Sequence, residues 1–82
     1  MKLKTFKKKV ISILAELKIQ PSKMVWQKES RFQKARYKKE YVFPEVWIYK
    51  GEMPAGLCLN GESFVEDGGE NYVREYLSAN LA

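Results

Sequence analysis

Histidine is absent from this 82-residue sequence, and cysteine occurs once, at Cys58. Because imidazole is the usual general base near neutral pH, the lack of histidine argues against acid–base catalysis. A single cysteine cannot form an internal disulfide, which excludes a disulfide-stapled secreted scaffold, so we expect a cytoplasmic protein. No stretch approaches the eighteen apolar residues of a membrane span. A membrane-surface helix over residues 2–19 is the weaker possibility, because its apolar face is needed to cover the sheet, and we expect no membrane partner.

Cysteine, the acidic residues and glycine also lack the sequence context that nucleophilic, metal-binding and phosphate-binding sites require. Cys58 stands between two leucines and is expected to pack as a small hydrophobe rather than to act as a nucleophile. The acidic residues 62, 66, 67 and 70 lack the alternate spacing of a calcium loop, and the five glycines form no phosphate-binding fingerprint. The sequence thus predicts a protein that is not an enzyme and that uses no cofactor and no metal.

Positive charge is abundant but confined to the first part of the chain. Residues 1–50 hold fourteen Lys and Arg against four acids, a net charge of +10, whereas residues 51–82 hold one Arg against six acids, a net charge of −5. Such asymmetry favours an anionic partner for the basic part. Alternatively, the acidic part folds back on the basic part or docks on a second copy in a homodimer. The length and composition predict one globular domain over residues 1–82.

Apolar residues recur at helical spacing near the start of the chain. The three- and four-residue intervals from Leu3 to Leu17 predict a helix over residues 3–19 that Pro21 ends. Several lysines in its first turns oppose the helix dipole, so that either this turn frays or the lysines serve a partner. At the other end of the chain, Asp67 and Glu70 resemble a capping box, and the face formed by Tyr72, Val73, Tyr76 and Leu77 predicts a closing helix to about residue 80.

Strands are expected between these helices. Alternating or aromatic-rich segments predict strands at residues 24–28, 37–43 and 46–50, with Pro44 at a bend or an edge. Asn60-Gly61 predicts a two-residue type I′ hairpin between residues 57–59 and 62–65. Residues 29–40 are ambiguous, since Ser30 and Gln33 form a capping-box pattern but the apolar positions make a poor helical face. We expect a loop to about residue 35 and then a strand.

These elements predict an α+β fold, with a small antiparallel sheet of three to five strands and both terminal helices packed on one of its faces. The order is α-β-β-β-(β)-α. Such an arrangement leaves the opposite face of the sheet open to solvent or to a partner.

Cations and aromatic rings are interleaved in the middle of the chain, where we expect the functional surface. Tyrosine, tryptophan and arginine dominate the binding energy of protein interfaces. We expect a non-catalytic regulator of the adaptor or inhibitor type that binds an acidic surface of a larger protein or nucleoprotein. The expected partner-binding residues are Arg31, Lys34, Arg36, Tyr37, Lys38, Lys39, Tyr41, Trp47 and Tyr49, with a secondary basic patch at Lys7, Lys8 and Lys9.

The same residues leave two alternatives open. Cations that neutralise phosphates and aromatic rings that stack on bases describe a protein that binds RNA or single-stranded DNA. The acidic last thirty-two residues place a protein partner slightly ahead of nucleic acid. In the second alternative the rings simply fill the core of a small domain and the lysines guard a strand edge against aggregation.

Overall fold

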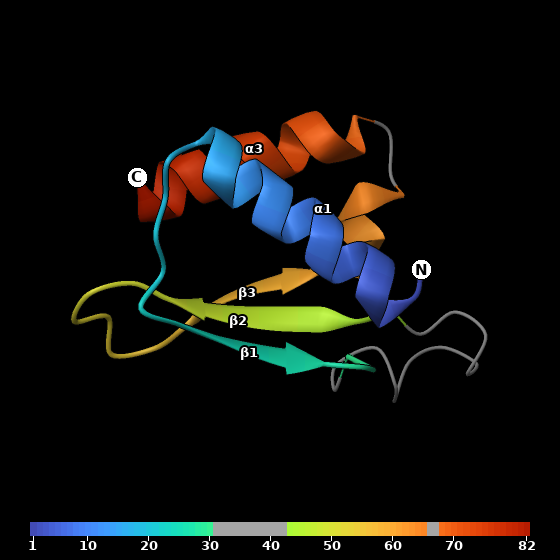
Figure 1. Cartoon of the computed structure of the whole chain (residues 1–82), viewed down its shortest axis with the longest axis horizontal. Helices are drawn as coiled ribbons and strands as arrows, with labels where there is room; N and C mark the ends of the chain where they lie inside the picture. Colours follow the sequence, from blue (N-terminus) through green and yellow to red (C-terminus); the bar gives the residue numbers. More distant parts are fainter. Residues whose placement is uncertain (31–42, 66–67) are drawn as a thin grey trace.

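The computed structural model describes residues 1–30, 43–65 and 68–82. Three strands form an antiparallel sheet in the order β1-β2-β3, and both α-helices cover the same face of it (Figure 1). The predicted α+β fold is confirmed. The described elements are α1 (Leu3–Glu16), β1 (Lys23–Gln27), β2 (Glu45–Tyr49), β3 (Leu57–Asn60), the short 3₁₀ helix η2 (Gly61–Phe64) and α3 (Gly69–Leu81).

Alternation along the central strand β2 separates the two faces of the sheet. Val46 and Ile48 are fully buried under the helices. Their cross-strand partners share that face because side chains alternate along a strand: Val46 pairs with Trp26 and Leu59, and Ile48 pairs with Met24 and Leu57. Glu45, Trp47 and Tyr49 alternate with these two residues and therefore lie on the opposite face, away from α1 and α3.

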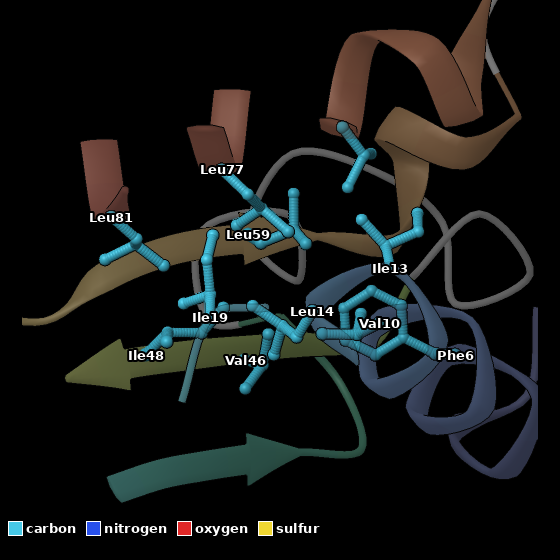
Figure 2. Packing of buried hydrophobic residues seen from close by; sticks show 11 residues of the cluster. Phe6, Val10, Ile13, Leu14, Ile19, Val46, Ile48, Leu59, Leu77 and Leu81 are labelled. Carbon is cyan, nitrogen blue, oxygen red and sulfur yellow. The ribbon is translucent and has the colours of Figure 1, made fainter. Parts of the chain in front are cut away.

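The apolar face predicted for the first helix forms the upper half of the core. Phe6, Val10, Ile13 and Leu14 are buried, and Val73, Leu77 and Leu81 of α3 pack into the same cluster (Figure 2). The ring of Phe6 meets Trp26 of β1 and Phe64 of η2 edge to face, with centroid distances of 5.8 and 5.9 Å. One aromatic side chain thus links the helix layer, the sheet and the 3₁₀ helix.

The first helix ends three residues earlier than predicted, and Pro21 is not the cause. The last helical residue is Glu16, and Lys18 adopts the left-handed conformation with φ of 58°. Lys18 N–H donates to the Ala15 carbonyl at 3.1 Å, and Ile19 N–H donates to the Leu14 carbonyl at 2.9 Å. This is the Schellman arrangement that closes many helices.

The predicted Asn60-Gly61 hairpin is wrong. Asn60 is extended, with φ of −108°, and Gly61 has no positive φ, whereas a type I′ turn needs positive φ at both residues. The Asn60 side chain instead caps η2 by accepting from Glu62 N–H at 2.8 Å. Gly61 N–H donates to the Pro44 carbonyl at 2.8 Å, so this segment continues the contact with the start of β2.

The closing helix is present but faces the core with a different set of residues. Tyr72 was expected in the core, yet its side chain is 51% exposed and stacks on the ring of Tyr76. The N-cap is Gly68, in the left-handed conformation; the predicted cap Asp67 lies outside the described residues. The strand predicted over residues 37–43 lies outside them as well, apart from Phe43, which belongs to no strand.

Candidate functional site

Four exposed residues follow one line along the outer side of α1. Lys4, Lys8 and Ile11 recur at helical spacing, and Lys18 continues the line just beyond the helix end. All four are exposed, and the Ile11 side chain is 51% accessible. We call this set the lysine row. Ile11 is the apolar member of this row, and its place beside Lys8 puts apolar surface next to positive charge.

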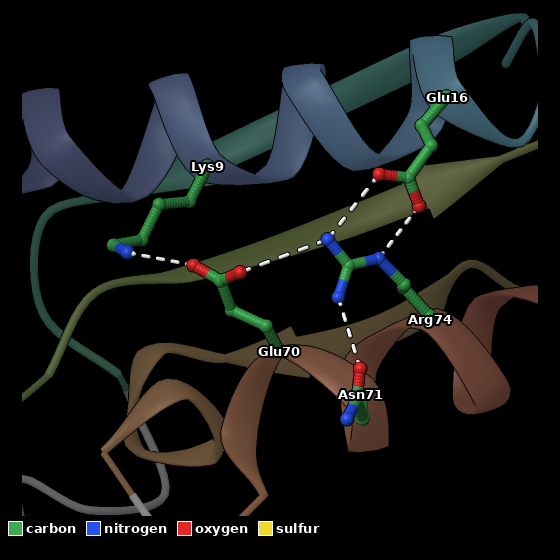
Figure 3. Close-up of polar contacts among 5 residues, drawn as sticks. All are labelled: Lys9, Glu16, Glu70, Asn71 and Arg74. Atoms are coloured by element: carbon green, nitrogen blue, oxygen red, sulfur yellow. Dashed lines mark hydrogen bonds and ion pairs between the residues drawn. The ribbon is translucent and has the colours of Figure 1, made fainter.

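The opposite flank of α1 is neutralised by α3, which runs alongside it (Figure 3). Lys9 Nζ pairs with Glu70 Oε1 at 3.1 Å. Arg74 Nε donates to Glu16 Oε2 at 2.6 Å, and Arg74 also lies 3.7 Å from Glu70. The hydrogen bond to Glu16 and the charges of both carboxylates raise the pKa of Arg74. Among the described residues, the acidic part of the chain therefore forms ion pairs with α1 on the side of Lys9 and Glu16. On that side Lys8 lines the same depression as Glu70 and Arg74 without an ion pair to Glu70.

The predicted basic patch of Lys7, Lys8 and Lys9 is divided by the fold. Lys7 Nζ lies 5.6 Å from the centroid of the Trp26 ring, in a cation–π contact over β1. Lys9 points the other way, to Glu70 and to the ring of Phe64, whose centroid lies 5.8 Å from Nζ. Lys8 is the member that belongs to the lysine row.

An open groove of about 860 Å³ begins at Ile11 and follows the end of α1 toward β1. Its floor is formed by Leu14 and Ile19, which also belong to the core, and Met24 stands at its far side. Among the described residues that line the groove, Lys18 carries the one ionisable side chain. The groove therefore combines an apolar floor with a cationic rim.

Trp47 and Tyr49 lie on the face of the sheet opposite α1 and α3, away from the lysine row. Both are half-buried. The Trp47 indole N–H donates to Glu45 Oε2 at 2.6 Å, and Glu45 is itself fully buried. The Tyr49 ring packs over Gly56, and Lys23 Nζ lies 5.4 Å from its centroid. These two predicted site residues share one face with each other but not with Lys7–Lys9.

Cys58 sits beside this buried carboxylate. Its Sγ is 3.9 Å from Glu45 Oε2, and the residue is half-buried. Burial, the negative charge of Glu45 and the hydrogen bond to it raise the pKa of Cys58 from 9.0 to about 11. The thiolate is thus scarce at neutral pH, which is unfavourable for a nucleophile.

The other predicted partner-binding residues, Arg31, Lys34, Arg36, Tyr37, Lys38, Lys39 and Tyr41, lie outside the described residues. Sequence reasoning missed three members of the lysine row: Lys4, Ile11 and Lys18. A usable signal existed for Ile11, because helical periodicity places it off the apolar face of the first helix and between lysines.

Comparison with known proteins found no matching family model, no matching curated protein and no matching solved structure. Within residues 1–30, 43–65 and 68–82, no group of three or more Cys, Asp or Glu side chains is placed to hold a metal ion. None of the helices in those same segments is both long and apolar enough to cross a bilayer.

Proposed function

We propose that this protein is a non-catalytic binding protein, of the adaptor or inhibitor type, that docks on an acidic surface of a larger protein through the lysine row. One observation carries the proposal. The carboxylates of α3 engage Lys9 and Arg74 and leave Lys4, Lys8 and Lys18 exposed to solvent. A row of like charges without counter-charges repels itself, so it lowers stability unless an anionic partner offsets the repulsion.

The residue between the lysines favours a protein over nucleic acid. Bases stack on aromatic rings, whereas an aliphatic side chain offers no π-face. Ile11 is aliphatic, and Tyr72, the exposed aromatic residue among those that the structure describes, belongs to α3 and not to the row. An exposed isoleucine one helical turn from Lys8 is instead suited to an apolar contact with charge beside it, as in the apolar centre and polar rim of a protein interface.

The absence of catalysis forms part of the same proposal. The sequence has no histidine, and the raised pKa of Cys58 keeps its thiol protonated. Glu16 and Glu70 are occupied by ion pairs with Arg74 and Lys9. These groups therefore serve the fold, and the lysine row is left for binding.

Affinity purification with charge-reversed variants tests the proposal. The tagged chain should recover a stoichiometric protein complex from a nuclease-treated extract of its own host. Lys4→Glu combined with Lys8→Glu should abolish that complex, because the reversed charges would repel an acidic surface. Lys23→Glu combined with Lys28→Glu, which reverses two exposed lysines outside the lysine row, is the matched control and should retain the complex.

A direct oligonucleotide titration tests the alternative. Single- and double-stranded 20-mers should bind weakly, and their affinity should collapse between about 50 and 200 mM salt, as is typical of non-specific phosphate contacts. Circular dichroism should show that the double variant is folded. Retention of the complex by a folded Lys4→Glu, Lys8→Glu variant, or tight salt-resistant binding of the oligonucleotides, would contradict the proposal.

A further inference from the structure

We propose that the groove at the end of α1 binds an acidic segment of a partner protein, which inserts an aliphatic or aromatic side chain beside Ile11 and places a carboxylate against Lys18. This inference rests on the proposed function, since it names the partner chemistry and the position at which the lysine row continues into a pocket. It is nevertheless tested by its own variants and its own probe.

The shape of the groove suits one or two inserted side chains. A volume of about 860 Å³ falls in the range of ligand-binding clefts. Leu14 and Ile19 are at most 5% exposed and form a rigid floor that belongs to the core, whereas Ile11 and Met24 stand at the sides. An apolar side chain placed here would cover Ile11, which is 51% exposed, and remove its surface from water.

The backbone at Lys18 provides an independent reason to assign its charge a role. Its φ of 58° lies in the left-handed region, where a side chain costs about 1–2 kcal/mol and glycine adopts the conformation freely. Helices of this kind most often carry glycine at this position, one residue beyond the C-cap. A lysine held here at the expense of stability, with its side chain lining the groove, is the pattern expected of a functional residue.

Charge decides the class of occupant. Among the described residues that line the groove, Lys18 is the one that is ionisable, and Lys8 lies one helical turn from Ile11. The whole chain carries a net charge of +5. A basic segment is repelled, and a second copy carries the same net charge of +5, while Glu70 of its acidic part is already paired with Lys9. An acidic segment that carries an apolar side chain can pack that side chain on Leu14 and Ile19 and place its carboxylate beside Lys18.

Selection from a random 12-residue peptide display library, with the full chain immobilised, tests this assignment without a known partner. Enriched peptides should carry Asp or Glu next to Leu, Ile, Phe or Trp. The most enriched sequence, synthesised with a fluorophore, should bind with an affinity that falls at least fivefold in Lys18→Gly and in Ile11→Ser. Lys28→Gln, an exposed lysine outside the groove lining, should bind it unchanged.

Lys18→Gly separates lost binding from lost folding, because glycine relieves the left-handed residue. We expect its Tm to rise by roughly 4 °C while its peptide affinity falls. Failure to enrich any peptide, enrichment of basic or uncharged peptides, or tight binding retained by Lys18→Gly would overturn the inference. Amide shifts of bound ¹⁵N-labelled protein that avoid Ile11 and Met24 would also overturn it.

The two proposals fail in different ways. If Lys4→Glu with Lys8→Glu loses the purified complex but Lys18→Gly and Ile11→Ser keep full peptide affinity, then Lys4 and Lys8 bind the partner and the groove assignment is wrong. If the chain forms a dimer in sedimentation equilibrium that Lys18→Gly dissociates, a second copy occupies the groove and the choice of an acidic foreign segment is wrong.

Discussion

Gly69, the first residue of α3, lies closer to the 3₁₀ helix than any side chain would permit. A Cβ built at this position would stand 2.5 Å from the Phe64 carbonyl oxygen and 2.9 Å from that of Ser63, and both neighbours are backbone atoms. Backbone cannot move aside as the end of a flexible side chain can. The absence of a side chain at Gly69 therefore sets the distance between η2 and α3.

Gly69→Ala should consequently destabilise the fold by about 1–3 kcal/mol, the usual cost of overpacking. Urea denaturation followed by circular dichroism measures the change. Glu75→Ala, on the exposed side of the same helix, should stay within about 0.5 kcal/mol of the parent. Equal stability of Gly69→Ala and the parent would show that the two helices can separate without cost.

Cys58 makes stability depend on pH in the alkaline range. Its pKa is raised from 9.0 to about 11 by burial, by the charge of Glu45 and by the hydrogen bond to that carboxylate. Between these values the unfolded chain loses the thiol proton while the folded chain keeps it, so stability present below pH 9 declines toward pH 11. Burial also raises the pKa of Tyr76, which adds a decline of the same sign.

Denaturation midpoints measured from pH 8 to pH 11 should therefore fall, and the fall should be smaller in Cys58→Ala. Alkylation by iodoacetamide at pH 8 should be about tenfold slower than for an unperturbed thiol, because the loss of thiolate outweighs its higher nucleophilicity. An alkaline decline that is identical in parent and variant would show that the fold does not raise the pKa of this thiol.

At the scale of the element, α1 begins without the features that usually start a helix. Lys2 is the N-cap, its side chain makes no capping hydrogen bond, and the first turn contains no acidic residue. An uncapped N-terminus leaves backbone N–H groups to water, and positive charges there oppose the helix dipole.

Lys2→Asp should stabilise the protein by about 1 kcal/mol through capping and a favourable charge at the helix start. Lys28→Asp makes the same change in net charge at an exposed position outside the helix and controls for general charge effects. Thermal denaturation of both variants measures the difference. An equal rise in Tm for the two would mean that net charge, and not the cap, limits the stability of α1.

The elements that could be predicted are those with local causes. The apolar spacing of Phe6, Val10 and Ile13 predicts both a helix and its buried face, and the alternation of β2 predicts which residues meet the core. Asn60-Gly61 misled the prediction because the choice between a hairpin and a strand end depends on a distant partner. That partner is the Pro44 carbonyl, sixteen or more residues away in the chain.

The candidate site was partly predictable for the same reason. Periodicity alone separates Lys8 from the core, but it cannot tell that Lys9 meets Glu70 and that Lys8 does not. That distinction depends on where α3 docks, which is a property of the tertiary packing. Likewise, the left-handed conformation of Lys18 depends on the direction that the chain takes between α1 and β1, and no residue pattern in the sequence predicts it.

At the scale of the whole molecule, the contact between α1 and α3 decides which lysines of α1 form ion pairs. Lys9 and Lys8 are adjacent in sequence and carry the same charge, yet one is paired with a carboxylate of the acidic part and the other belongs to the lysine row. Reversing the charge of Lys9 should therefore lower the stability of the fold, whereas reversing the charge of Lys8 should not.

Lys9→Glu should lower stability, because it replaces attraction to Glu70 with repulsion. Lys8→Glu should leave stability unchanged or raise it by about 0.3–0.5 kcal/mol, because it removes repulsion and adds an i,i+4 pair with Lys4. Both variants have the same net charge, so urea denaturation of the pair at 10 mM salt isolates the local effect. The difference should shrink at 500 mM salt, where exposed charges are screened. Equal stability at low salt would mean that α3 does not distinguish the two sides of α1, and the lysine row would lose its basis as an uncompensated surface.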